Sequence, residues 1–343
     1  MRDTPDTALA VALLAAFLIG CGGDDPSPAR HRDVTADDVP PGAADSAASS
    51  RSSTRALMRR VDFHMPHDIV LEIGHLRGEM KPTVPGRPVS FDDVESFALT
   101  IGTAEIAIGM DVLATLMNDW VFAFDDAPLR DFSFETEDGR LHMSGTLDKI
   151  VNIGFDIVAD LTLMPSGELR ARPVDINVLG FIGGGFLDAI GLSLEDLVDT
   201  RDAVGVRVDG NDLYLDPLRI LPPPRMTGTI TEIRVEPGRL VQVFGDTAAA
   251  RDPADGAPGR NFMRFEGGTL AFGKLTMADA ILVVIDQDPA DPLDFSIVDY
   301  ALQLVAGYSR TRKDLGLDVW MPDLDDVRRG AASAGPPRTD PPQ

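Results

Sequence analysis

Three histidines near the start of the folded region are the first residues whose type suggests chemistry. His64 and His67 lie in the run Phe63–His67, and His75 follows shortly after. Imidazole nitrogens bind zinc and related metals, so three of them could nominally form a metal site. No carboxylate is patterned with them, however, and such histidines are typical of an ordinary surface. The sequence therefore predicts no metal site here.

Two acidic segments are the other nominal candidates for metal binding. Asp286–Asp291 and Asp323–Asp326 each carry three aspartates. Calcium prefers carboxylate oxygens, but neither segment has the glycine and terminal glutamate spacing of an EF-hand loop. Both segments are typical of solvated acidic loops.

No motif in the chain assembles a catalytic centre. The sequence lacks the G-x-S-x-G elbow, the H-E-x-x-H zinc motif, the P-loop and the Rossmann glycine pattern. Gly183–Gly185 is a glycine run without the spacing that cradles phosphate, and it is more typical of a chain turn. We therefore expect a protein that is not an enzyme and needs no cofactor.

The N-terminus carries one residue with a specific chemical expectation. Ala8–Ile19 is an apolar run long enough for a signal-peptide core but too short for a bilayer span of about 20 residues. It ends in Leu-Ile-Gly before Cys21, which resembles the lipobox of a bacterial lipoprotein. The resemblance implies that residues 1–20 are removed and that Cys21 is lipidated. A plain secretory signal with an incidental cysteine is the alternative.

Composition excludes several other classes of protein. Cys21 is the only cysteine, so the chain forms no internal disulfide and no cysteine-based zinc site. The formal net charge of −24 argues against a nucleic-acid partner, because binding to phosphates requires a cationic surface. Hydrophobic residues make up 44% of the chain, which is enough for an ordinary globular core.

Composition also divides the chain into regions. Residues 21–55 are rich in Gly, Asp, Pro, Ser and Ala, and we expect them to form a flexible tether. Residues 56–325 have the patterns of a folded domain. Residues 329–343 repeat the tether composition and predict a disordered tail.

Strands with alternating hydrophobicity dominate the expected domain. Asn152–Met164 alternates over its whole length, which predicts a long strand with one apolar face, and Glu168–Leu179 is its expected partner with a switch at Pro173. Glu95–Ile108 changes phase midway, as a bulged strand does. Met110–Phe122 has a helical apolar face.

Short turns connect most of the remaining segments. Asp138-Gly139 predicts a hairpin, and further strands are expected at Phe262–Phe272 and Leu275–Ile285, before an amphipathic segment near Ile297–Tyr308. Strands joined by hairpins, with two or three helices, predict an antiparallel α+β fold.

The order of these elements resembles the bacterial branch of the tubular lipid-binding (TULIP) superfamily. The phrases that carry the resemblance are DGRLHMSGTL, the long strand pair, and GVRVDGNDLYLDPLRILPPPRMTGTITEIRVEPGRLVQVFG. The similarity covers about 94–245, leaving 262–322 as a C-terminal extension that adds strands to a sheet edge or closes the groove. It implies an elongated domain in which a long, strongly curved antiparallel sheet wraps one or two helices around an apolar groove.

One apolar face of the long strand pair and the following helix would line that groove. Either side chains or a ligand must fill it, since burying apolar surface is favourable. The expected lining residues are Phe155, Ile157, Leu161, Leu163, Ile176, Val178, Phe186, Ile190 and Leu194.

We therefore expect a membrane-anchored lipoprotein of the bacterial cell envelope that binds or shuttles phospholipid or other acyl lipid. Gly22 after the cysteine resembles the default for sorting to the outer membrane, with the domain facing the periplasm or the surface. A non-catalytic envelope scaffold or adhesion module with a fully packed core is the alternative. An envelope enzyme with an unrecognised site is a third.

Overall fold

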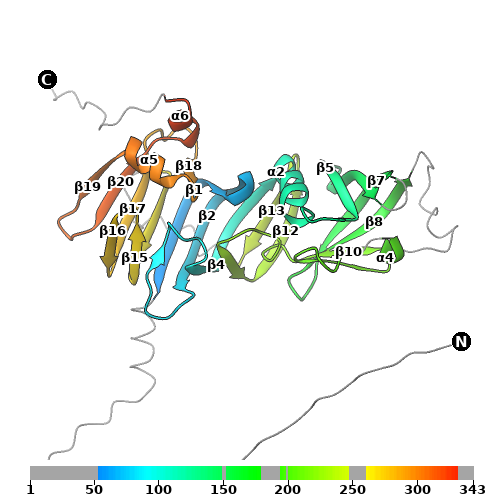
Figure 1. Ribbon diagram of the computed structural model, residues 1–343, viewed down its shortest axis with the longest axis horizontal. Coiled ribbons are helices and arrows are strands. Elements are labelled where there is room, and N and C mark those ends of the chain that lie inside the picture. The colour runs from blue at the N-terminus through cyan, green and yellow to red at the C-terminus, as the bar shows by residue number, and fades with distance from the viewer. Residues whose placement is uncertain (1–52, 149–151, 179–193, 198–199, 247–259, 331–343) are drawn as a thin grey trace, which may run out of the picture. The chain divides into compact units, whose positions relative to one another are not determined.

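Strands make up most of the computed structural model, which describes residues 53–148, 152–178, 194–197, 200–246 and 260–330 (Figure 1). Its centre is an antiparallel pair, β1 (Thr54–Met65) and β2 (Ile69–Pro82), joined by the short turn η1 (Pro66–Asp68). Alternate residues of β1 point into the core, but the buried positions change parity beside Arg60, whose φ is 48°. The pattern of β1 is therefore interrupted midway, and the sequence did not predict this strand.

The largest sheet extends on both sides of this pair and curls into a half-barrel. Its eleven strands include two that pair beside the main path, β11 against β4 and β18 against β1. In order across the sheet they are β12 (Ile230–Glu236), β13 (Arg239–Phe244), β4 (Phe97–Gly109), β2, β1, β14 (Phe262–Glu266), β17 (Ile281–Asp286), β20 (Leu317–Met321) and β19 (Tyr308–Thr311), with β11 (Arg225–Gly228) and β18 (Leu293–Ser296) beside them.

The phase change predicted in the β4 segment is confirmed as a β-bulge. Arg77 of β2 pairs with Thr103 and Gly78 pairs with Ile101, so Gly102 is the extra residue. Burial then switches from Phe97, Leu99 and Ile101 to the opposite parity, at Ala104, Ile106 and Ile108. The bulge lets one long strand keep an apolar face toward the core while the sheet curls.

A second, six-stranded sheet contains the long strand pair. Its strands, in order, are β5 (Leu129–Glu137), β6 (Arg140–Asp148), β7 (Asn152–Leu163), β8 (Leu169–Val178), β10 (Asp212–Leu215) and β9 (Val206–Asp209). The predicted switch at Pro173 is confirmed, because the pairing skips from Val158–Asp175 to Ala159–Pro173 and leaves Val174 unpaired.

A helix links the two sheets. It comprises α2 (Met110–Leu116) and the π-helical turn η2 (Met117–Val121), and it follows β4 directly. The side chain of Asn118 accepts a hydrogen bond from the Phe132 N–H at 2.8 Å and donates to the Phe132 carbonyl at 3.0 Å. This contact ties the helix to β5, and the predicted helix over Met110–Phe122 is confirmed.

The C-terminal extension divides between sheets where the sequence predicted two continuous strands. Phe262–Phe272 turns at Gly267-Gly268, so β14 joins the large sheet next to β1. The following strand, β15, pairs in a small sheet instead. The small sheet contains β16 (Leu275–Ala278), β15 (Thr269–Phe272) and β3 (Val89–Ser90), and the remaining helices are α4 (Leu194–Leu197), α5 (Tyr300–Ala306) and α6 (Leu324–Arg328).

The α+β expectation is confirmed at the level of a β-rich, mainly antiparallel fold with a curled sheet. Four described strand pairs are parallel: β1–β18, β4–β11, β3–β15 and β17–β20. The expected region boundaries also shift slightly. Thr54 and Arg55 of the predicted tether belong to β1, and α6 continues past Asp325 to Arg328. The signal peptide with Cys21, and residues 331–343 of the tail, lie outside the described residues.

Candidate ligand-binding groove

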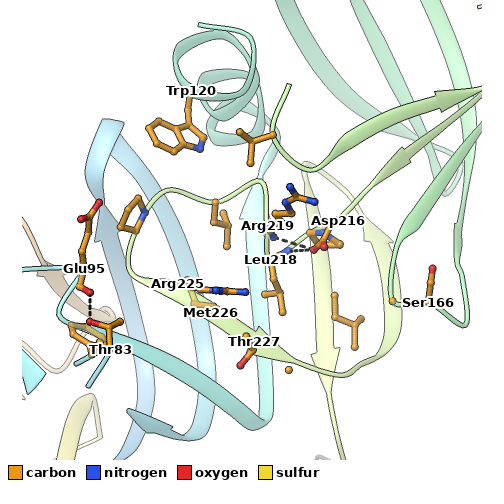
Figure 2. Close-up of a pocket in the computed structure, with 18 residues that line it drawn as sticks. Thr83, Glu95, Trp120, Ser166, Asp216, Leu218, Arg219, Arg225, Met226 and Thr227 are labelled. Carbon is orange, nitrogen blue, oxygen red and sulfur yellow. Dashed lines mark hydrogen bonds between the residues drawn. The ribbon is translucent and has the colours of Figure 1, made fainter. Parts of the chain in front are cut away.

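An open groove of about 890 Å³ lies where the two larger sheets meet. Residues from β4, η2, the β7–β8 turn, β11 and the 216–224 segment line it (Figure 2). Small-molecule sites are typically concave spaces of about 300–1,000 Å³. The groove therefore has the size of a ligand site.

Apolar side chains form much of the groove wall. Phe97, Met226 and Ile230 are buried core residues that reach the groove from β4, β11 and β12. Leu218 is half-buried and Val204 is 46% exposed. A wall of this kind offers surface that an apolar ligand group would cover.

Hydrogen bonds made by Asp216 hold the start of the 216–224 segment in place. The Asp216 carboxylate accepts hydrogen bonds from the N–H groups of Leu218 at 3.2 Å and Arg219 at 3.0 Å. The Asp216 N–H donates to the Gly205 carbonyl at 2.8 Å. Gly205 has a φ of 71°, and a Cβ there would lie 2.8 Å from the Ile220 side chain, so glycine is required.

Two arginines bring positive charge to the groove. Arg219 lies in the 216–224 segment and Arg225 begins β11, and both are exposed. Neither forms an ion pair within the described part of the chain, where most arginines do, as Arg172 does with Asp212 and Arg234 with Glu105. The groove therefore has two guanidinium groups available to a ligand.

Trp120 supplies a third polar group. Its ring contacts that of His67, with the centroids 4.8 Å apart and the ring planes tilted by 41°, and it borders the groove from η2 (Figure 2). The indole Nε1–H is buried and has no hydrogen-bond partner among the described residues. An unsatisfied buried donor costs about 1–3 kcal/mol, and this nitrogen with almost no exposed surface is such a donor at the border of the groove.

An enclosed apolar cavity of about 50 Å³ lies next to the groove. It is bounded by the six-stranded sheet and by residues of α2, β4 and β13, including Leu113, Leu161 and Leu240. Pro217 and Leu221 line both the cavity and the groove. The 216–224 segment is thus the wall between an open, mixed-polarity space and a closed, apolar one.

The predicted lining residues divide between this cavity and the packed core. Leu161 lines the cavity. Phe155 and Ile157 are buried and do not line it, and the Phe155 ring packs against Phe132 with centroids 6.3 Å apart. Leu163, Ile176 and Leu194 are partly buried against the core. The side chain of Val178, and Phe186 and Ile190 entirely, lie outside what the structure describes.

His64 and His67, two of the three candidate histidines, contact other side chains of the protein. His64 pairs with Asp294, and the His67 ring packs at a tilt against Trp120. In the described ranges, no group of three or more His, Cys, Asp or Glu side chains is arranged to hold a metal ion. Burial raises the pKa of Asp286 to about 6, and burial together with Asp286, Asp291 and Asp294 raises the pKa of Asp323 to about 7.

Sequence reasoning missed Arg219, Arg225 and Trp120 as groove residues. The signal that marks the place in the sequence is the proline break Pro222–Pro224, which has Arg219 before it and Arg225 after it. Which arginines lack acidic partners depends on strand pairing and could not be read from the chain.

Comparisons with family models, with curated proteins and with solved structures found no match for this chain. Within the residues that the structure describes, no helix combines the length and the hydrophobicity that a bilayer crossing requires.

Proposed function

We propose that this protein is an envelope lipoprotein that binds an acyl lipid in the groove beside the 216–224 segment. The observation that carries the proposal is the shared wall: Pro217 and Leu221 separate an open groove of about 890 Å³ from an apolar cavity of about 50 Å³. A lipid has a polar head and an apolar chain, and these two adjoining spaces match that division.

The chain of the lipid would lie along the apolar wall of the groove. Each buried methylene contributes roughly 0.8 kcal/mol, so covering Leu218, Leu221 and Val204 favours an alkyl chain over a purely polar ligand. The cavity as it stands holds no more than a small part of an acyl chain. Leu221 and Pro217 line both spaces, so we expect deeper entry of the chain to require movement of Leu221.

Placement in the envelope rests on Cys21. An N-terminal lipid anchor followed by a tether would keep the groove near a membrane from which it could take a lipid. The net charge of −24 favours attachment through an anchor over broad docking on anionic headgroups.

Native mass spectrometry of the full chain carrying Cys21→Ser, purified without detergent, tests the proposal. The substitution removes the acyl chains of the anchor, so a lipid that co-purifies is a bound ligand. We expect a co-purifying or added acyl lipid to bind at one per chain. A clean apo mass that is unchanged by incubation with phospholipid would refute the function.

A charged substitution in the groove tests whether the lipid binds there. Leu218→Glu is expected to lower lipid occupancy at least about tenfold, since a buried carboxylate would have to lose its hydration beside the alkyl chain. Leu315→Glu adds the same charge at a position that is 87% exposed and outside the groove, and it should leave occupancy unchanged. Phe155 and Ile157 are unsuitable for this test, because a charge in the packed core would unfold the sheet.

A scaffold or adhesion module with a packed core is the second candidate. The small size of the apolar cavity favours it, since side chains already fill most of the interior. Recovery of an envelope protein partner by full-length protein, without any lipid, would support this candidate over the first.

A further inference from the structure

We propose that the groove selects lipids with an anionic phosphate headgroup, which Arg219 and Arg225 bind. This inference rests on the proposed function and specifies its ligand. Guanidinium groups bind phosphate with paired N–H donors, and such charge-assisted hydrogen bonds are about twice as strong as neutral ones.

The two arginines reach the groove from different elements. Arg219 is carried by the 216–224 segment, whose backbone is fixed by the Asp216 hydrogen bonds, and Arg225 opens β11, which pairs with β4 (Figure 2). Both guanidinium groups are therefore attached to ordered backbone on the rim of the groove. Leu218 and Leu221 line the same groove, so a headgroup at the arginines could leave its alkyl chain against the apolar wall.

The other charged groups that line the groove are two carboxylates, and neither pairs with the arginines. Asp216 accepts two backbone N–H groups, and Glu95 lies on the opposite side of the groove from Arg219 (Figure 2). Neither carboxylate forms an ion pair with Arg219 or Arg225. Many other arginines of the described structure do pair with an Asp or Glu, as Arg207 does with Glu168.

The net negative charge of the protein opposes a preference for anionic ligands. A protein with a formal charge of −24 repels anions and attracts cations through its general field. Preferential binding of an anionic amphiphile would therefore have to come from local groups in the groove.

Three probes with one alkyl chain and different heads test the inference: dodecyl phosphate, dodecyl maltoside and dodecyltrimethylammonium, each below its micelle concentration. Trp120 and Trp320 are the two tryptophans of the chain. In a Trp320→Phe background the indole fluorescence reports Trp120 in the groove alone, and calorimetry supplies an independent affinity. We expect dodecyl phosphate to bind at least about tenfold more tightly than the other two probes.

Two double variants identify the groups responsible. Arg219→Gln with Arg225→Gln should remove the preference for phosphate and leave the affinity for dodecyl maltoside within about twofold. Lys274→Gln with Lys313→Gln removes the same charge from two exposed turns outside the groove and should retain the preference. In 1 M salt, where the Debye length is about 3 Å, the preference should shrink.

The outcomes separate the inference from the function on which it rests. Equal binding of all three probes, or a preference that survives the arginine substitutions, would overturn the headgroup assignment while leaving lipid binding intact. Failure of every probe to bind would overturn the proposed function, and the headgroup assignment with it.

Discussion

Single buried carboxylates control how this fold responds to pH. Burial raises the pKa of Asp62 and of Asp286 to about 6, with Glu72 the next contribution at Asp62. Burial and neighbouring aspartates, Asp286 first, raise the pKa of Asp323 to about 7. An ordinary aspartate titrates near 3.9 when the chain is unfolded. Between about pH 4 and pH 7 these three sites bind more protons in the folded protein than in the unfolded chain, so their contribution to the free energy of unfolding falls as pH rises.

Asp323→Asn should stabilise the protein at pH 7.5 and flatten its pH dependence. Asp323 is the N-cap residue of α6 but makes no side-chain cap hydrogen bond, so asparagine at this position loses no capping contact. Removing the buried charge should raise the free energy of unfolding by about 1 kcal/mol, which is less than the full pKa shift implies because the carboxyl is partly solvated. Urea unfolding at pH 5 and pH 7.5 measures both effects.

Glu135→Gln is the matched control, since Glu135 is exposed on β5. It should leave the pH dependence as in the parent protein. An Asp323→Asn protein that is less stable than the parent at pH 7.5 would contradict the assignment of a destabilising buried charge.

Among the elements, the turn between β14 and β15 decides which sheet each strand joins. Gly267 and Gly268 have φ values of 82° and 62°, and β15 leaves the large sheet at this point to pair with β3 and β16. The turn packs on the start of β1, where the Thr54 hydroxyl donates to the Gly267 carbonyl at 3.1 Å. Two glycines inside an apolar run thus end one strand and begin another.

Gly268→Ala should destabilise the fold by about 3 kcal/mol. The added Cβ would lie 2.6 Å from the Thr54 hydroxyl and 2.8 Å from the Ser53 carbonyl, and the backbone has the left-handed φ that alanine disfavours. Thermal unfolding followed by circular dichroism measures the change. Gly154→Ala, on β7 with open space around its Cα, should change stability by less than about 1 kcal/mol, and equal losses in both variants would count against the steric account.

A hydroxyl joins the two larger sheets. Thr136 of β5 donates to the Glu236 carbonyl at 2.9 Å and accepts from the Gly238 N–H at 2.7 Å, in the β12–β13 turn. The groove lies where these sheets meet, so its shape depends on the contacts between elements rather than on any one of them.

For the whole molecule, the N-terminal strand and the C-terminal extension complete one sheet. β1 pairs with β2 on one side and β14 on the other, and Arg55 forms an ion pair with Glu266, 211 residues away in the chain. The folded region therefore cannot be cut at the end of the 94–245 core without exposing the edge of β1.

Cys21→Ser should release the protein from the membrane without changing its folded region. Cys21 lies outside the described residues, and the attachment predicted for this chain is through lipidation of its thiol. Fractionation of cells and the mass of the mature chain measure the result. A Cys21→Ser protein that stays in the membrane fraction after a salt wash would show that the anchor lies elsewhere.

Strand pattern and turn chemistry predicted much of the fold from local sequence. The β7 segment alternates cleanly, Asp138-Gly139 makes a tight hairpin, and the phase change in the β4 segment became the bulge at Gly102. β1 was missed because its apolar alternation changes phase beside Arg59-Arg60, which hides the period of two.

The lining of the groove could not be predicted from local sequence patterns. Leu161 was predicted as a lining residue and does line the apolar cavity, but the same alternation included Phe155 and Ile157, which pack into the core. Periodicity gives the face of a strand on which a residue lies, not whether side chains or open space lie opposite.

The sequence by itself determined much of the local backbone: the strands of the β4 and β7 segments, the hairpin at Asp138-Gly139, and that a lone cysteine follows an apolar run. These depend on interactions between near neighbours. Only the tertiary structure decided that Arg219 and Arg225 have no acidic partner among the described residues, that Trp120 borders the groove, and that Pro217 and Leu221 line both the groove and the cavity. Those features arise where distant strands pair and pack, so their geometry exists only once the whole chain has folded.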